Sequence, residues 1–258
     1  MNFKKYSMTI MVLCIITISL NFAGSTGQLT ADEIIDRVKE NQVDSKNSKT
    51  QAEMILSDKN GITETREIIM FEKDENDKIT MLMRFLSPKS VEGVTLLSIE
   101  NGDKIYLHMP AYQKPRRIAG SSKQENFMGT DFSYEDISMD YQSEEYQKSL
   151  LEETAEHFLI EVLPDDKDLA YNKFLLYVQK EQFYVEKVEF YDLDGQLTKT
   201  LEIKEVKIDD EGKFTPMKIE LNNLLDNHQT KMNIKEIEYN LELSSGFFTI
   251  RTLPKPSL

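Results

Sequence analysis

The sequence predicts a mainly β protein in which a single short helix precedes one long, curved antiparallel sheet. Between residues 48 and 243, segments of strand length alternate apolar with polar side chains, which is the period of a half-buried strand. Turn signals such as Asn-Gly and Asp-Gly separate about ten or eleven of these segments. Helical segments do not alternate with the strands, which argues against a parallel α/β fold.

Residues 1–25 have the organisation of a secretory signal peptide. Lys4 and Lys5 precede a short apolar run, and small residues follow it. The run is short for a membrane span, so we expect cleavage near residues 23–27, with an uncleaved membrane anchor as the alternative. The remaining residues, 26–258, are predicted to form a single domain.

Composition narrows the classes of function. The formal net charge of -14 argues against a nucleic-acid-binding protein, which needs a basic surface. The single cysteine, Cys14, lies in the signal segment and lacks the small residue before it that a lipoprotein signal requires. We therefore expect an exported domain without disulfides, stabilised by an apolar core that a chain of 258 residues can form.

The predicted helix begins at Thr30, where Glu33 completes a capping box, and ends near Asn41. Its apolar stripe must dock on the sheet, and it consists of Ile34, Ile35 and Val38. The strand at 79–86 is apolar at both odd and even positions, so we expect both of its faces to be covered.

Two changes of parity in the later strands predict β-bulges, which bend a sheet. The buried positions shift between Ile203 and Val206, and again between Ile234 and Ile237. A sheet of this size cannot leave an apolar face bare. The helix and the irregular segment 120–146 are the covers that the sequence offers, so the concave side either is a filled core or encloses a cavity lined by Met and aromatic residues.

Signs of an enzyme are scarce. His108, His157 and His228 lack the spacing of a metal site, so no metal or cofactor is predicted. The acidic cluster formed by Asp131, Glu135 and Asp136 admits three interpretations: ion pairing within the fold, ligand contact, or acid–base catalysis. Pairing is favoured because Arg116 and Arg117 are near in sequence. We therefore expect a protein that is not an enzyme.

Two runs of residues resemble a known family. R-R-I-A at 116–119 and F-M-G-T-D-F-S-Y-E-D at 127–136 are similar to motifs of the outer-membrane lipoprotein-sorting protein family, in a divergent branch related to the periplasmic lipoprotein carrier LolA. The resemblance implies an incomplete, strongly curved antiparallel β-barrel with a helical lid. It also implies a cavity that takes acyl chains, without a cofactor.

The function implied is that of a soluble periplasmic carrier that binds acyl chains of lipoproteins or other lipids and transfers them towards the outer membrane. Its partners would be an inner-membrane exporter and an outer-membrane acceptor. The alternative is a non-transporting interaction protein on the same fold, either an accessory subunit of an exporter or an envelope-stress sensor.

Site residues are predicted in two groups. The residues expected to contact the ligand are Met81, Met83, Phe85, Leu97, Tyr106, Phe127, Met128, Phe132 and Tyr134. The residues expected to hold or gate the rim of the cavity are Arg116, Arg117, Asp131, Glu135 and Asp136. The gating arginine of the carrier does not map onto one position, so Arg66, Arg84, Arg116 and Arg117 all remain candidates.

Overall fold

The computed structural model describes residues 28–75, 78–165, 169–244 and 246–255. The expected signal peptide (residues 1–25), its cleavage site (23–27) and Cys14 lie outside these residues. No helix of the described part of the chain is long and apolar enough to cross a membrane.

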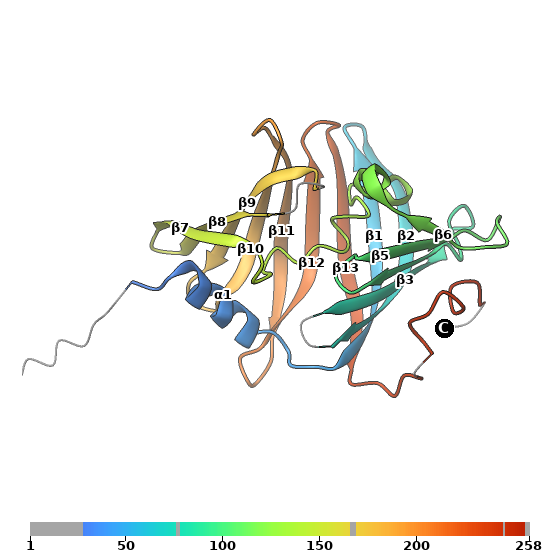
Figure 1. Cartoon of the computed structure of the whole chain (residues 1–258), viewed down its shortest axis with the longest axis horizontal. Helices are drawn as coiled ribbons and strands as arrows, with labels where there is room; N and C mark the ends of the chain where they lie inside the picture. Colours follow the sequence, from blue (N-terminus) through green and yellow to red (C-terminus); the bar gives the residue numbers. More distant parts are fainter. Residues whose placement is uncertain (1–27, 76–77, 166–168, 245, 256–258) are drawn as a thin grey trace, which may run out of the picture.

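Thirteen antiparallel strands in the described residues form one sheet, with the order β6-β5-β4-β3-β2-β1-β13-β12-β11-β10-β9-β8-β7 (Figure 1). The first strands are β1 Asn47–Asp58, β2 Gly61–Asp74, β3 Ile79–Ser87, β4 Thr95–Ile99, β5 Lys104–His108 and β6 Arg116–Ile118. The later strands are β7 Gln147–Glu153, β8 His157–Leu163, β9 Tyr171–Gln179, β10 Tyr184–Asp192, β11 Leu197–Ile208, β12 Phe214–Asn223 and β13 His228–Tyr239.

The sheet consists of two meanders, β1–β6 and β7–β13, which join where β1 pairs with β13. The outermost strands β6 and β7 do not pair, so the sheet is curved but open. This confirms the expected incomplete barrel. The chain between these two edges, residues 119–146, is called the crossing segment below. It contains the short 3-10 helices η1 (Gly120–Gln124) and η2 (Phe127–Gly129).

Both predicted bulges are present. Opposite β12, the register of β11 shifts on each side of Glu205. Opposite β1, Gln51 pairs with Glu236 and Ala52 with Ile234, so Lys235 is the extra residue of β13. Each bulge accounts for one change of parity in the sequence, because an inserted residue moves every later side chain to the other face.

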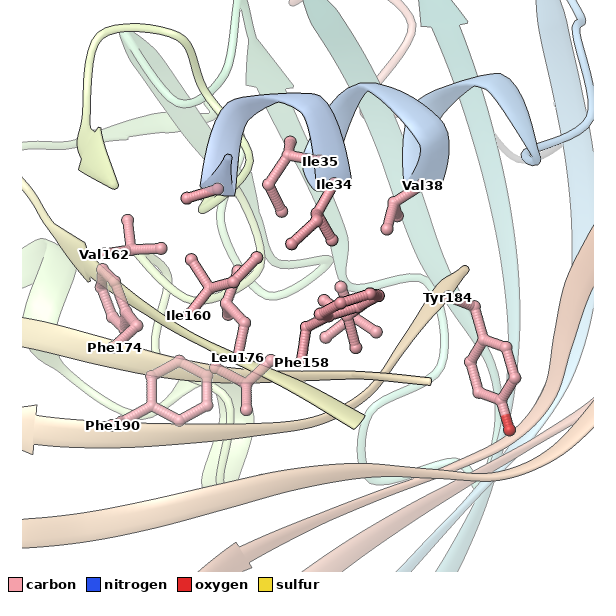
Figure 2. Close-up of a cluster of buried hydrophobic side chains, with 14 of the residues drawn as sticks. Ile34, Ile35, Val38, Phe158, Ile160, Val162, Phe174, Leu176, Tyr184 and Phe190 are labelled. Carbon is pink, nitrogen blue, oxygen red and sulfur yellow. The ribbon is translucent and has the colours of Figure 1, made fainter. Parts of the chain in front are cut away.

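Helix α1 spans Ala31–Glu40 and begins at the predicted capping box. The backbone N–H of Glu33 donates to the Thr30 hydroxyl at 3.2 Å, and the Thr30 N–H donates to the Glu33 carboxylate at 2.8 Å. The helix packs its apolar stripe on the inner face of β8–β10, as Figure 2 shows for Ile34 above Phe158 and Ile160. It thus covers one half of the concave face.

The crossing segment covers the other half of that inner face. Phe127 and Tyr134 are buried in a cluster with Phe85, Met83 and Ile68. The opposite, outer face of β2–β5 is covered by the C-terminal segment, residues 243–244 and 246–254, which lies at the far end of the sheet from α1 (Figure 1). The strand β3 is therefore buried on both sides, as its sequence predicts.

Candidate functional site

An apolar cavity of about 270 Å³ lies between the inner face of the sheet and the crossing segment. Six methionines line it, a side chain that adapts to irregular apolar ligands. They are Met54, Met70, Met81, Met83, Met139 and Met232. The other apolar lining residues are Phe127, Phe132, Ile137, Tyr141, Phe190, Leu201, Ile219 and Leu221, and the polar ones are Glu72, Thr130 and Asp136. This composition suits an apolar chain with few polar contacts.

A second, wider cavity of about 800 Å³ lies beside the first and is called the vestibule below. The end of α1, the following residues 41–45, and the ends of β2 and β3 at Asp74 and Ile79 form its wall. Met139 and Tyr141 line both cavities, so these two side chains lie between them. Burial raises the pKa of Tyr141 to about 12.

Asp131 fixes the crossing segment to β13. Its carboxylate pairs with His228 Nδ1 at 2.7 Å and accepts from the Thr230 hydroxyl at 2.7 Å. The Asp131 N–H donates to the same hydroxyl at 3.0 Å. Because Asp131 is only 1 % exposed, these contacts are protected from solvent and hold the backbone of the segment in one place.

Asp136 fixes the next turn of the segment to β9 and β11. Its carboxylate accepts from Lys199 Nζ at 2.6 Å and from the Tyr171 hydroxyl at 2.7 Å. Burial, together with the adjacent Asp136 carboxylate, raises the pKa of Tyr171, so the tyrosine remains a hydrogen-bond donor. Beside it, Glu135 accepts from the Ala170 N–H at 2.9 Å.

Arg66 of β2 holds the segment at its other end. One guanidinium nitrogen donates to the carbonyl of Met128 at 2.7 Å, and the other pairs with Glu64 at 2.6 Å. The arginine also lies over the Phe85 ring at 5.3 Å. Its proximity lowers the pKa of the Glu64 carboxyl. Met128 has a φ of 51°, a strained conformation for a residue with a side chain, and the Arg66 contact stabilises that turn.

The other candidate arginines lie elsewhere. Arg84 is buried on the outer face and donates to Thr95 and to the Leu253 carbonyl. Arg116 bonds the Tyr134 hydroxyl, and Arg117 beside it is exposed.

The acidic residues therefore have different partners from those suggested by sequence proximity. Among the described residues, the Asp131 carboxylate contacts the His228 ring and the Asp136 carboxylate forms an ion pair with Lys199. Neither is formed with the nearby Arg116 or Arg117.

The residues predicted to contact the ligand divide into three sets. Met81, Met83, Phe127 and Phe132 line the apolar cavity. Phe85, Met128 and Tyr134 pack behind them, with Phe85 and Tyr134 each 5.4 Å from the Phe127 ring. The last two, Leu97 and Tyr106, pack against the C-terminal segment on the outer face.

Several lining residues were not predicted from the sequence, chiefly Met54, Met70, Glu72 and Met232. The signal that identifies them is the alternation of inward-facing and outward-facing residues along a strand. Met70 and Glu72 are two residues apart on β2, so both face the same side of the sheet. That alternation becomes informative once the inner face of the sheet is known.

One family model matches a large part of the chain. A family model whose description reads "Uncharacterized protein" matches residues 77–255, which is more than half of the chain. A search of curated proteins finds no match.

Solved structures with the same fold cover most of the chain. A domain from Vibrio parahaemolyticus, named as a candidate outer membrane lipoprotein-sorting protein, is 26% identical with a TM-score of 0.81, over 87% of this chain and 98% of that one. A DUF1329 family protein from Desulfovibrio piger is 24% identical with a TM-score of 0.78, over 86% and 97%. A LolA superfamily protein from Nitrosomonas europaea is 20% identical with a TM-score of 0.70, over 86% and 98%.

Proposed function

We propose that this chain, which belongs to the family whose model matches residues 77–255 and shares its fold with a candidate lipoprotein-sorting domain, is a carrier that holds acyl chains of lipoproteins or other lipids. The observation that carries the proposal is the methionine-lined cavity between the sheet and the crossing segment. Burial of each methylene group contributes about 0.8 kcal/mol, so even part of an acyl chain would be held firmly.

The carrier would act in the periplasm. Residues 1–25 would direct export, and residues 26–258 would form the carrier domain. The lipid would pass from an inner-membrane exporter to an outer-membrane acceptor, since an acyl chain cannot cross the aqueous space unprotected. Cell fractionation followed by N-terminal sequencing would test this, with a mature protein beginning near residues 24–28 as the expected result.

Release of the lipid would require the crossing segment to move. Arg66 is the gating arginine that we propose, because its side chain joins the inner face of β2 to the backbone of the crossing segment at Met128. The carboxylates of Asp131 and Asp136 would keep the rest of the segment in place.

Blocking the cavity tests the proposal. Met70→Trp would fill part of a space of about 270 Å³, and we expect it to reduce uptake of a fluorescent fatty acid by about tenfold or more. Ile62→Trp is the control, because Ile62 lies on the same strand but is 72% exposed. Thermal unfolding would confirm that both variants are folded.

The carrier role would be refuted if the wild-type protein took up no fatty acid, or if Met70→Trp bound it as well as Ile62→Trp does. Native mass spectrometry of protein purified without detergent provides a second readout, with acyl-containing adducts expected on the wild type. Capture of a membrane exporter by a protein free of lipid would instead favour the non-transporting interaction protein.

A further inference from the structure

The inner face of β2 leads from the apolar cavity to the vestibule. Met70 and Glu72 line the apolar cavity, and Asp74, two residues further, lines the vestibule. On the neighbouring strand the partners follow the same order, since Glu72 pairs with Met81 and Asp74 with Ile79. Glu72 therefore lies at the junction of the two cavities.

Glu72 differs from the other carboxylate of the apolar cavity. Asp136 is matched by the ammonium group of Lys199 at 2.6 Å. The partner of Glu72 is the neutral hydroxyl of Ser48, and no lysine or arginine of the described residues forms an ion pair with it. Desolvation raises the pKa of the Glu72 carboxyl, the expected response of an acid that has lost water without gaining a cation.

The vestibule carries a net negative charge. Its carboxylates are Glu40, Asp44, Asp74 and Asp140, and its cations are Lys39 and Lys213. Lys213 donates to the backbone carbonyl of Glu40, so part of its hydrogen-bonding capacity is already used. Four acids against two lysines attract cationic groups and repel anionic ones at the entrance to Glu72.

We propose that the carried molecule is a single-chain amphiphile whose apolar chain occupies the methionine-lined cavity and whose protonated amine head is bound by Glu72. This inference rests on the proposed carrier function and names its class of ligand. A cavity of about 270 Å³ is below the usual size of a whole ligand pocket, about 300–1,000 Å³, so it accommodates one chain while the head lies at the junction.

Three probes with the same chain test the inference: dodecylamine, dodecanol and dodecanoate, each below its micelle concentration at neutral pH. Calorimetry on the full carrier domain should show the amine binding about tenfold or more tightly than the carboxylate, with the alcohol between them. Glu72→Gln should weaken binding of the amine by about tenfold and leave the alcohol within about twofold.

The control is Glu67→Gln, because Glu67 is exposed on the same strand and pairs with Lys235 away from the cavity. Glu67→Gln should reproduce the wild-type order of affinities. Equal affinity for the three heads, or an unchanged amine affinity in Glu72→Gln, would overturn the amine inference while leaving the carrier in place. Failure of all three probes to bind would overturn the carrier function itself.

Discussion

Most of the charged side chains on the inner face that line or border the cavity have a partner of opposite charge. Arg66 is matched by Glu64 and by the Met128 carbonyl, and Asp136 by Lys199. These contacts join the sheet to the crossing segment, so they hold that segment in position and also stabilise the fold. Glu72 has only a neutral partner, so its ionised form destabilises the folded protein when no cation is bound beside it.

The unfavourable ionisation of Glu72 in the folded state predicts that stability depends on pH. Because its pKa is raised in the folded state, the folded protein retains this proton longer than the unfolded chain as the pH rises. The contribution of Glu72 to stability therefore falls between the unfolded and the folded pKa. We expect Glu72→Gln to have a higher melting temperature than the wild type at neutral pH.

That difference should shrink as the pH falls through the raised pKa of Glu72 in the folded state, and it should be lost below the ordinary glutamate value of about 4.3. Melting curves of both proteins across this range would measure it. A Glu72→Gln variant that is less stable than the wild type at neutral pH would contradict the assignment of an unmatched carboxylate.

Removal of the Arg66 side chain should loosen the crossing segment locally. In Arg66→Gln, the bond to the Met128 carbonyl and the Glu64 pair are lost, and we expect a loss of about 2–4 kcal/mol of stability. Amide exchange should accelerate first at residues 127–130, and a bound fatty acid should dissociate faster. Arg117→Gln, at an exposed position, should change neither rate.

The secondary structure elements differ in how clearly the sequence encodes them. The α1 capping box, the hairpin turn at Asn60-Gly61 and both bulges are predicted correctly because each depends on a local pattern. The sheet has thirteen strands rather than the expected ten or eleven. The two additional strands, β6 and β7, are the edges of the sheet.

Both edge strands lack the pattern that identifies a strand. The first, β6, has three residues directly after Pro115, too few for alternation to be visible. The second, β7, exposes most of its residues, since one of its edges faces solvent, and it carries consecutive leucines at 150–151. Pairing with β5 and β8 determines these strands, and that pairing depends on the tertiary fold.

The C-terminal segment is a structural element in its own right. Leu253 is fully buried with Phe71, Leu82 and Leu97 on the outer face. We expect Leu253→Ala to cost about 2–5 kcal/mol of unfolding free energy. Ile250→Ala, at a position 41% exposed, should cost less than about 0.5 kcal/mol. Urea unfolding would measure both, and equal losses would mean that the segment does not pack as described.

At the scale of the whole molecule, the sequence predicts the curved open sheet but not which side of it is enclosed. Residues 79–86 and 95–99 carry apolar side chains at both odd and even positions, so parity alone does not separate their two faces. For this reason the sequence predicts Leu97 and Tyr106 as cavity residues, whereas they contact the C-terminal segment. The path of the crossing segment, a long-range property, settles which face is the inner one.

The crossing segment follows the sheet from edge to edge in an ordered way. It leaves β6, is held to β2 through Arg66, to β13 through Asp131, and to β9 and β11 through Asp136, and then enters β7. The segment is therefore held at several separate points along its length and not at a single hinge. Because these contacts are separate, the loss of one would leave the others in place, so the crossing segment would detach from the sheet in steps.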